Sequence, residues 1–201
     1  MENEKKRYFW DERYASEEYI YGTEPNKFFA GCIAEYTPGK ILFPAEGEGR
    51  NAVYAAKHGW EVTAFDLSIE GKRKAERLAQ SENVSIDYLH GGFEDMPFPP
   101  ASFDCVVLIY AHFPKHRELY HKMVSEWLKP GGVLILEGFE KAQKNRSTGG
   151  PGNSAMLFSR EEMKIDFQSL SKLTIEEKLI TLDEGELHVG VASVIRVLGI
   201  K

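Results

Sequence analysis

Residues that could bind a nucleoside follow two short apolar runs. The first run, Lys40 to Pro44, leads into the turn Ala45-Glu46-Gly47-Glu48-Gly49, and the spacing Gly47-x-Gly49-x-x-Ala52 fits the pattern G-x-G-x-x-G/A of nucleotide-binding turns. Glycines lack the Cβ that would keep a backbone away from a ligand. Asp66 ends the second run, where a carboxylate can accept hydrogen bonds from both ribose hydroxyls. We therefore expect a nucleoside ligand; the alternative is a structural turn and a helix-capping Asp.

Two nucleoside ligands suit such a turn. NAD needs a cradle for its pyrophosphate, whereas S-adenosylmethionine carries a sulfonium and an ammonium and no phosphate. Glu46 and Glu48 flank Gly47, and two carboxylates would repel a pyrophosphate but are compatible with positive groups. The turn therefore favours S-adenosylmethionine, and an NAD(P)-dependent oxidoreductase is the weaker alternative.

Candidates for contact with a second substrate follow the apolar run Phe103 to Ile109. They include Tyr110, His112 and Arg117. His112 could orient or deprotonate an acceptor, or it could be packed and satisfied by backbone groups. Arg117 could bind a negative charge, or it could be solvated at the start of a helix. His112 and His116 are four residues apart but Pro114 separates them, so we expect no metal site.

Alternating elements must position these residues. Apolar patterns predict strands at residues 40–44, 61–66, 84–89, 103–109 and 133–137, and helices at 26–36, 50–58, 69–80 and 115–128. Residues 129–132, Lys-Pro-Gly-Gly, are expected to break the last of these helices before the strand that follows. Two β-rich runs, 173–182 and 187–198, flank the turn Asp183-Glu184-Gly185-Glu186 and predict a hairpin. The expected fold is α/β: a mostly parallel sheet with helices on both faces and an antiparallel C-terminal hairpin.

Composition limits the class of protein. The 201 residues are 42% hydrophobic and 28% charged, with a net charge of −6, which is typical of a globular chain and argues against nucleic acid as a partner. No apolar run approaches the ~20 residues of a membrane span, and the charged start does not resemble a secretory signal. Two cysteines, Cys32 and Cys105, are expected to stay reduced in a cytoplasmic protein.

One domain is expected over residues 1–201. Its N-terminal arm, residues 1–24, is rich in aromatic side chains and is either packed on the domain or a lid over a ligand. The loop 139–155, whose central part is rich in Gly, Asn, Ser and Lys, is a second candidate lid.

Over essentially its whole length the sequence resembles the class I S-adenosylmethionine-dependent methyltransferases. Within them it is most similar to the small bacterial group related to tellurite-resistance and thiopurine methyltransferases. The resemblance is carried by short segments in the expected order, at residues 10–14 (WDERY), 21–25 (YGTEP), 45–51 (AEGEGRN), 61–68 (EVTAFDLS), 103–107 (FDCVV), 112–114 (HFP) and 128–132 (LKPGG).

The resemblance implies a Rossmann-like, seven-stranded sheet whose last strand is antiparallel, with S-adenosylmethionine as the cofactor. It places the donor against Ala45, Glu46 and Gly47 at the methionine part, Asp66 at the ribose, Leu67 at the adenine, and Gly92, Phe93 and Leu108 nearby. The acceptor would be a small molecule, such as a thiol or a chalcogen oxyanion, methylated by in-line displacement. The sequence selects neither one acceptor nor an oligomeric state.

The chain departs from the family pattern at three positions. The family often has Asp where this chain has Phe43, Gly where it has Ala45, and Asp where it has Gly92. These departures leave a second hypothesis open, a protein that binds S-adenosylmethionine without turnover.

Overall fold

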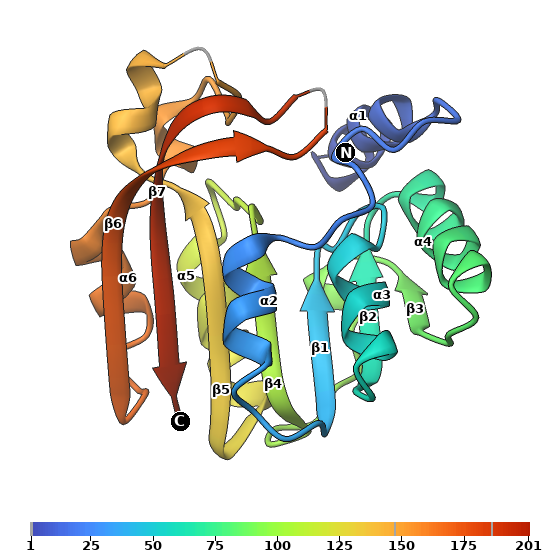
Figure 1. Ribbon diagram of the computed structural model, residues 1–201. Helices are drawn as coiled ribbons and strands as arrows, with labels where there is room; N and C mark the ends of the chain where they lie inside the picture. Colours follow the sequence, from blue (N-terminus) through green and yellow to red (C-terminus); the bar gives the residue numbers. More distant parts are fainter. Residues whose placement is uncertain (1, 147, 186) are drawn as a thin grey trace. The chain divides into compact units, whose positions relative to one another are not determined.

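The computed structural model describes residues 2–146, 148–185 and 187–201 (Figure 1). Met1, Ser147 and Glu186, which belong to the predicted arm, loop and hairpin turn, lie outside the described residues. The chain divides into two compact units, Met1–Pro97 and Phe98–Lys201. The single domain predicted for residues 1–201 stays a prediction, and each unit is described by itself.

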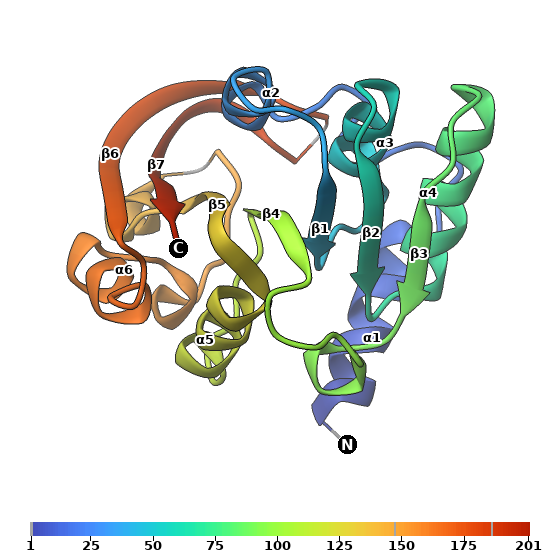
Figure 2. The ribbon, with the colours of Figure 1, turned by 90° about the horizontal axis from the view of Figure 1, so that it is seen from below.

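The first unit holds three parallel strands and the helices that connect them. Strand β1 pairs with β2, and β2 pairs with β3, so the three lie side by side (Figure 2). Helices α3 and α4 pack on each other and on β2. The elements are α1 (Glu2–Tyr14), α2 (Lys27–Ile33), β1 (Lys40–Pro44), α3 (Arg50–Lys57), β2 (Glu61–Asp66), α4 (Ile69–Ser81), β3 (Asp87–His90) and the 3-10 helix η1 (Phe93–Asp95).

Parallel pairing brings the chemistry-bearing residues of this unit to one edge. Pro44, the last residue of β1, is in register with Phe65, next to the end of β2. The turn after β1 and the residues after β2 therefore leave the sheet at the same edge. Ser68 accepts a hydrogen bond from Gly71 N–H and caps α4.

The second unit combines one parallel strand pair with an antiparallel hairpin. Strand β4 pairs with β5 in parallel, β5 pairs with β7 antiparallel, and β6 and β7 form the predicted hairpin. The elements are β4 (Phe103–Ile109), α5 (Arg117–Trp127), β5 (Leu128–Phe139), the 3-10 helices η2 (Lys141–Asn145) and η3 (Ser154–Met156), α6 (Arg160–Asp166), β6 (Lys172–Asp183) and β7 (Val189–Ile200).

The strand order is β3-β2-β1-β4-β5-β7-β6 in one seven-stranded sheet. Ile41, Leu42 and Phe43 are consecutive in β1 and all fully buried, so both faces of this strand are covered. The predicted fold class, an α/β Rossmann-like architecture with a mostly parallel sheet and an antiparallel C-terminal hairpin, is confirmed.

Several element predictions need correction. The helix predicted at 26–36 ends at Ile33, and the second hairpin strand, predicted at 187–198, runs over Val189–Ile200. The third strand begins at Asp87 rather than residue 84. Helix α5 ends before Pro130 as expected, but β5 begins at Leu128 rather than Val133, because the strand absorbs the glycines through a shift of register and a left-handed Gly131 (φ +80°). Helix α6 was not predicted, although Ser159 and Glu162 form a capping box at its start.

Candidate active site

Hydrogen bonds hold the glycine turn of the first unit against the end of β2. Gly47 N–H donates to Asp66 Oδ2 (3.0 Å), and the Tyr88 hydroxyl donates to the Gly47 carbonyl (2.6 Å). Gly47 has a left-handed backbone (φ +65°), and a Cβ there would lie 2.6 Å from the Tyr14 hydroxyl oxygen. Residue 47 must therefore be glycine, as expected where a backbone closely approaches other groups.

Asp66 is a buried carboxylate with acceptor capacity left. Its Oδ2 accepts from Gly47 and its Oδ1 accepts from Ser68 N–H (2.8 Å). Burial raises the pKa of Asp66 to about 6, against the lowering effect of these two hydrogen bonds. At neutral pH the group is ionised, and each oxygen retains a lone pair that can accept a ligand hydroxyl.

Glu46 closes the start of helix α3. Its Oε1 accepts hydrogen bonds from Asn51 N–H (2.9 Å) and Ala52 N–H (2.8 Å). Burial raises the pKa of Glu46 to about 7. Backbone N–H groups at a helix N-terminus are what a bound phosphate uses. Here a side chain of the same turn occupies two of them, so they are not a cradle for a pyrophosphate.

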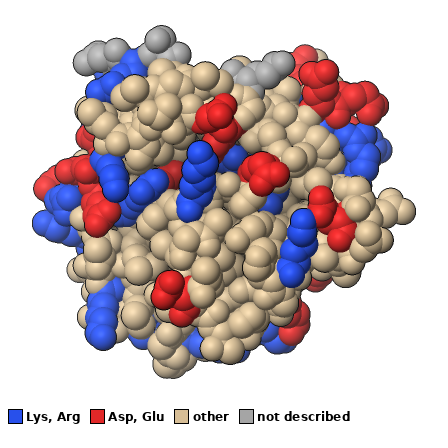
Figure 3. Space-filling view, viewed as in Figure 1, with Lys and Arg blue, Asp and Glu red and all other residues tan. Residues whose placement is uncertain are grey.

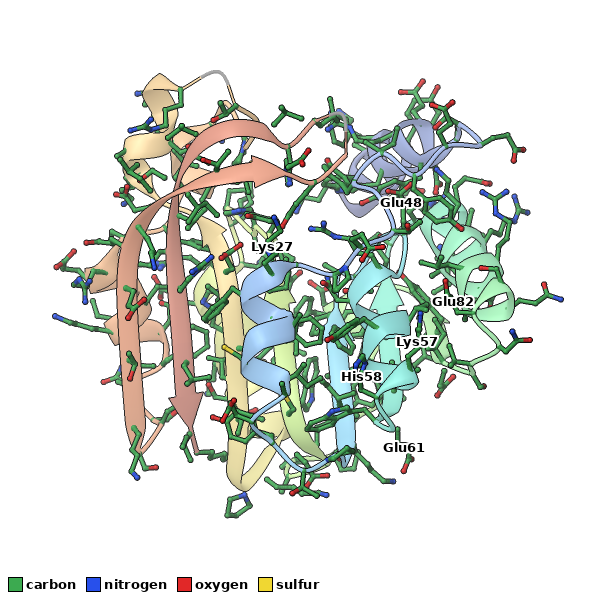
Figure 4. All side chains as sticks on the ribbon, viewed as in Figure 1. Lys27, Glu48, Lys57, His58, Glu61 and Glu82 are labelled. Carbon is green, nitrogen blue, oxygen red and sulfur yellow. The ribbon has the colours of Figure 1, made fainter. Side chains whose placement is uncertain are left out.

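Glu48 fastens the N-terminal arm to the turn. Its side chain is 3% exposed and pairs with Lys74 at 2.7 Å, whose side chain is 6% exposed. Glu48 also accepts hydrogen bonds from Ile20 N–H (3.1 Å) and Tyr21 N–H (3.2 Å). Figure 4 shows Glu48 beside the segment that follows α1. One carboxylate thus joins the turn, α4 and the arm.

The arm itself is an integral part of this unit. Asp11 Oδ1 accepts from Ser68 Oγ (2.6 Å) and Ile69 N–H (3.0 Å), which adds a second cap to α4. Tyr14 is 6% exposed and stacks with Trp10 at 5.5 Å between ring centroids. These contacts agree with an arm that packs on the domain, which is one of the two interpretations of residues 1–24. The other interpretation, a lid over a ligand, stays a prediction.

The residues expected near the adenine lie together. A Cβ added to Gly92 would lie 3.3 Å from Leu67 Cδ2, so the two residues are neighbours. Phe93 is buried and meets Phe65 edge to face at 5.1 Å. Gly92 N–H donates to Asp95 Oδ2 (2.9 Å), so a carboxylate is present beside the position where the family often has Asp.

Sequence reasoning assigned no individual role to two residues of this site. Asp11 lies within the segment 10–14 that carries the family resemblance. Its partners at the start of α4, Ser68 and Ile69, follow it by 57 and 58 positions in the chain, so the local pattern does not reveal the cap. Tyr88 lies in a strand pattern, and no sequence signal marks its bond to Gly47.

In the second unit, Tyr110 belongs to a polar network. Its hydroxyl donates to Glu137 Oε1 (2.8 Å), and Arg196 Nε donates to Glu137 Oε2 (2.6 Å). Tyr110 follows β4 with a left-handed backbone (φ +53°), a conformation that costs roughly 1–3 kcal/mol for a non-glycine residue and concentrates at functional sites. Sequence reasoning missed Glu137 and Arg196, although a glutamate inside the apolar run of β5 was a signal.

His112 is satisfied by backbone groups. Its Nδ1 lies 2.5 Å from the Met156 carbonyl oxygen, and Phe139 N–H donates to its Nε2 (3.3 Å). Burial lowers the pKa of His112 to about 4. These contacts fit a neutral ring with its proton on Nδ1, which is the packed interpretation that the sequence left open.

Arg117 is engaged inside the same unit rather than solvated. Its Nη1 donates to Asp166 Oδ2 (2.9 Å), and this oxygen also lies 2.7 Å from His121 Nδ1. The interaction joins α5 to α6. Leu108 is fully buried in β4, one residue before its end.

Residues 41–132 match the family model described as "Methyltransferase domain". A demethylmenaquinone methyltransferase of Clavibacter sepedonicus is 27% identical over 107 residues, which are 52% of this chain and 43% of that protein. The chain spans less than half the length of this relative.

Solved structures share the fold. A structure of S-adenosylmethionine-dependent methyltransferases from Methanosarcina mazei superposes with a TM-score of 0.67 at 20% identity, over 85% of this chain and 96% of that one. TehB from Haemophilus influenzae gives a TM-score of 0.71 at 17% identity, over 98% of this chain and 67% of that one. The family model covers the part of the chain from the first strand to the glycines before Val133, and the likeness to the solved structures, at 20% identity or less, shows a shared fold.

Proposed function

We propose that the chain is an S-adenosylmethionine-dependent methyltransferase that acts on a small-molecule acceptor. The observation that carries the proposal is the occupation of the α3 N-terminus by Glu46 beside an Asp66 carboxylate that can still accept ribose hydroxyls. A pyrophosphate would meet a carboxylate at this position, whereas the sulfonium and ammonium of S-adenosylmethionine would meet a favourable charge. The same observation speaks against the oxidoreductase alternative.

The residues present fit the donor. Asp66 would hold the ribose, and Leu67, Gly92 and Phe93 would border the adenine. Ala45, Glu46 and Gly47 would lie against the methionine part, where Gly47 leaves no room for a Cβ. Leu108 stays a predicted contact that the fit does not require.

When bound, S-adenosylmethionine supplies a methyl group that is already activated by its sulfonium. The protein's task is then to position the acceptor and exclude water. The acceptor would form its bond to the methyl carbon as the carbon–sulfur bond on the opposite side breaks, and any proton that it carries would leave to solvent. Tyr110, Arg117 and His112 are the proposed acceptor-side residues. Because backbone groups engage both ring nitrogens of His112, it would contact the acceptor through its neutral ring rather than through a hydrogen bond.

A thiol or a chalcogen oxyanion is the proposed acceptor class. Such nucleophiles need little help from a general base, which agrees with a neutral, backbone-bonded His112. The tellurite-resistance-like subgroup belongs to this proposal and rests on the sequence segments that carry the resemblance.

Nucleic acid is not the proposed acceptor. The net charge is −6, and on the face shown in Figure 3 Lys and Arg side chains alternate with Asp and Glu side chains. Phosphate backbones need a surplus of positive charge.

Among the described residues, no helix is both long and apolar enough to cross a bilayer. We propose that the protein acts in the cytoplasm.

Thermal unfolding with S-adenosylhomocysteine, and with NAD in parallel, tests the cofactor. A ligand at about 100 times its Kd adds about 2.7 kcal/mol and raises the Tm by about 5–10 °C in a chain of this size. We expect this rise with S-adenosylhomocysteine alone; a rise with NAD alone would overturn the proposal.

Methyl transfer is tested separately by product analysis with thiols, selenite and tellurite as acceptors. Methylated product supports the enzyme. Donor binding without product from any of these acceptors would favour the second hypothesis, a binding protein without turnover.

A further inference from the structure

One carboxylate lies inside the apolar strand β5. The side chain of Glu137 has no exposed surface, and residues 134–136 before it are apolar and buried. Arg196 lies opposite Glu137 on β7, and its Nε donates to Glu137 Oε2 (2.6 Å). A buried ion pair contributes little stability beyond what apolar side chains of similar volume would give. The placement of Glu137 therefore points to a function.

Tyr110 is fixed to this glutamate at two points. Its N–H donates to the Glu137 carbonyl (2.7 Å), and its hydroxyl donates to Glu137 Oε1 (2.8 Å). The Tyr110 ring stacks on Phe139 and meets His188 edge to face, each at 4.7 Å between ring centroids. Tyr110 is half-buried and directly follows β4, and parallel sheets bind ligands at the carboxyl ends of their strands. Its hydroxyl is thus oriented in advance at the edge where an acceptor is expected.

The direction of the Tyr110 hydrogen bond limits what the hydroxyl can do. A carboxylate that is paired with a guanidinium only accepts hydrogen bonds, so the single hydrogen of the Tyr110 hydroxyl points to Glu137. Toward any further group the hydroxyl oxygen can therefore only accept. An oxyanion would bring lone pairs to this oxygen and be repelled, whereas a group that carries a hydrogen would donate to it.

We infer that Glu137 is a positioning residue that holds the Tyr110 hydroxyl as a hydrogen-bond acceptor. It thereby makes the site selective for a neutral acceptor with a hydrogen on its nucleophilic atom, such as a thiol, over an oxyanion. The inference rests on the proposed function and deepens it, because it separates the two acceptor classes proposed there. Glu137 acts through Tyr110 and needs no contact of its own with the substrate.

The physical reason is the charge that develops during methyl transfer. As the thiol sulfur forms its bond to the methyl carbon, the bond from this carbon to the donor sulfur breaks, and its electron pair stays with S-adenosylhomocysteine. The neutral thiol becomes positive, and its hydrogen becomes acidic and is released to solvent. The Tyr110 oxygen, polarised by the Glu137 carboxylate, accepts from this hydrogen and stabilises the developing charge. An oxyanion loses negative charge in the same step and gains nothing from this contact.

The variant Glu137→Gln reverses the hydrogen bond at nearly constant volume. Arg196 Nε is a donor, so the amide oxygen of the new side chain stays on its side and the amide nitrogen faces Tyr110. The amide then donates to the Tyr110 oxygen, and the Tyr110 hydrogen is released toward the acceptor. Glu126→Gln is the matched control, because Glu126 is exposed on α5 and pairs only loosely with Lys122 (3.7 Å).

Initial rates with 2-mercaptoethanol and with selenite at pH 7 measure the selectivity as the ratio of the two kcat/KM values. We expect the wild type and Glu126→Gln to prefer the thiol. In Glu137→Gln this ratio should fall by about 10- to 100-fold, the range of one hydrogen bond to a charged group. Calorimetry with S-adenosylhomocysteine should give affinities within about twofold of wild type, which shows that the variant is folded.

A double variant tests whether Glu137 acts through Tyr110. Tyr110→Phe removes the hydroxyl and should also lower the thiol preference. Adding Glu137→Gln to Tyr110→Phe should change the ratio by no more than about twofold, because the group that Glu137 orients is then absent.

Four results would overturn the inference. They are a wild-type preference for selenite, an unchanged ratio in Glu137→Gln, an equal loss of both rates in that variant, and additive effects in the double variant. The equal loss would give Glu137 only a structural role, and additivity would mean that it does not act through Tyr110. A wild type that binds S-adenosylhomocysteine but methylates neither probe would contradict the proposed function itself, which is a distinct outcome.

Discussion

Three carboxylates lie around Gly47, and each has a different kind of partner. Asp66 accepts from backbone N–H groups of two loops, Glu46 accepts from the start of a helix, and Glu48 is paired with a lysine. A carboxylate that is paired with a cation inside the fold, such as Glu48, contributes to stability. A carboxylate whose oxygens can accept further hydrogen bonds can also bind a ligand. Asp66 and Glu46 keep such acceptor capacity.

Asp66→Asn should weaken S-adenosylhomocysteine binding by about 10- to 100-fold. The amide loses the negative charge, and hydrogen bonds to charged groups contribute about 1.5–3 kcal/mol. Calorimetry at pH 7.5 measures the change. Asp87→Asn, an exposed residue at the opposite end of β3, is the control and should leave affinity unchanged. Equal affinities for wild type and Asp66→Asn would remove Asp66 from the donor site.

Glu46 should make the stability of the protein depend on pH. Its pKa is about 7 in the folded state, against an ordinary value of 4.5 for a glutamate in the unfolded chain. Between these values the folded protein holds a proton that the unfolded chain releases, so raising the pH favours unfolding. The contribution is fully present below about pH 4.5 and is lost as the pH rises through about 7.

Urea unfolding at pH 5 and pH 8 measures this effect. The unfolding free energy of the wild type should fall from pH 5 to pH 8. In Glu46→Gln this fall should be smaller by about 1–2 kcal/mol. Asp66, with a pKa of about 6, contributes a decrease of the same sign that the variant retains. A variant with the same pH dependence as wild type would contradict the prediction.

At the scale of elements, the N-terminal arm and the glycine turn form one assembly. Tyr19 donates its hydroxyl hydrogen to the Lys74 carbonyl (3.0 Å), and Glu48 receives the arm's backbone at Ile20 and Tyr21. The segment is thus attached through α4 and the turn at once. Loss of one buried charge should release it.

Glu48→Gln should destabilise the protein by about 3–5 kcal/mol, because Lys74 would remain buried without a counter-charge. Limited proteolysis should then cut within residues 15–24. The double variant Glu48→Gln/Lys74→Met should recover part of the stability. Glu82→Gln is the control, because Glu82 pairs with Lys57 at the surface and should contribute no more than about 1 kcal/mol (Figure 4). Similar losses of stability in Glu48→Gln and Glu82→Gln would contradict the role of Glu48 in attaching the arm.

The contact between α3 and α4 depends on Gly49. This residue precedes α3 with φ +88°, and a Cβ there would lie 2.7 Å from Ala75 Cα and 2.4 Å from Ala75 Cβ. Gly49→Ala should therefore cost roughly 2 kcal/mol or more, from strain and displacement of α4. In Gly31→Ala, where an added Cβ meets nothing within 4 Å, stability should be unchanged or slightly higher. Chemical denaturation compares the two, and equal stabilities would contradict this packing.

At the scale of the whole molecule, the candidate groups divide between the two units. The glycine turn, Asp66 and the adenine-side residues belong to residues 1–97, whereas Tyr110, Glu137 and Arg196 belong to residues 98–201. This division suggests that donor binding and methyl transfer can be separated by mutation. The network around Tyr110 is the place to test it.

Tyr110→Phe should leave the affinity for S-adenosylhomocysteine within about twofold of wild type and lower kcat for an accepted thiol or oxyanion by about 10- to 100-fold, the range expected for loss of one positioned polar group. Calorimetry and initial rates measure the two effects. Phe113→Leu, which removes an aromatic contact with Tyr120 in the same unit, is the control. A large loss of donor affinity in Tyr110→Phe would assign this residue to the donor instead.

The order and type of most elements, and the place of the proposed donor turn, could be predicted from the sequence. Alternating apolar runs predicted strands 40–44, 61–66 and 103–109 with their observed bounds, because the interior of a parallel sheet demands continuous apolar residues. Gly47 and Asp66 could be predicted as neighbours, because parallel strands end at one edge of a sheet.

The partner of each charged group could not be predicted from the sequence and is known from the folded chain. Glu46 and Glu48 are equivalent in sequence, yet Lys74, 26 residues further on, reaches Glu48 alone. His112 is identified as backbone-bonded only once Met156 and Phe139 are placed beside it. Local patterns report burial and periodicity, which depend on neighbours in the chain. Charge compensation and proton affinity depend on groups that folding brings together from distant positions.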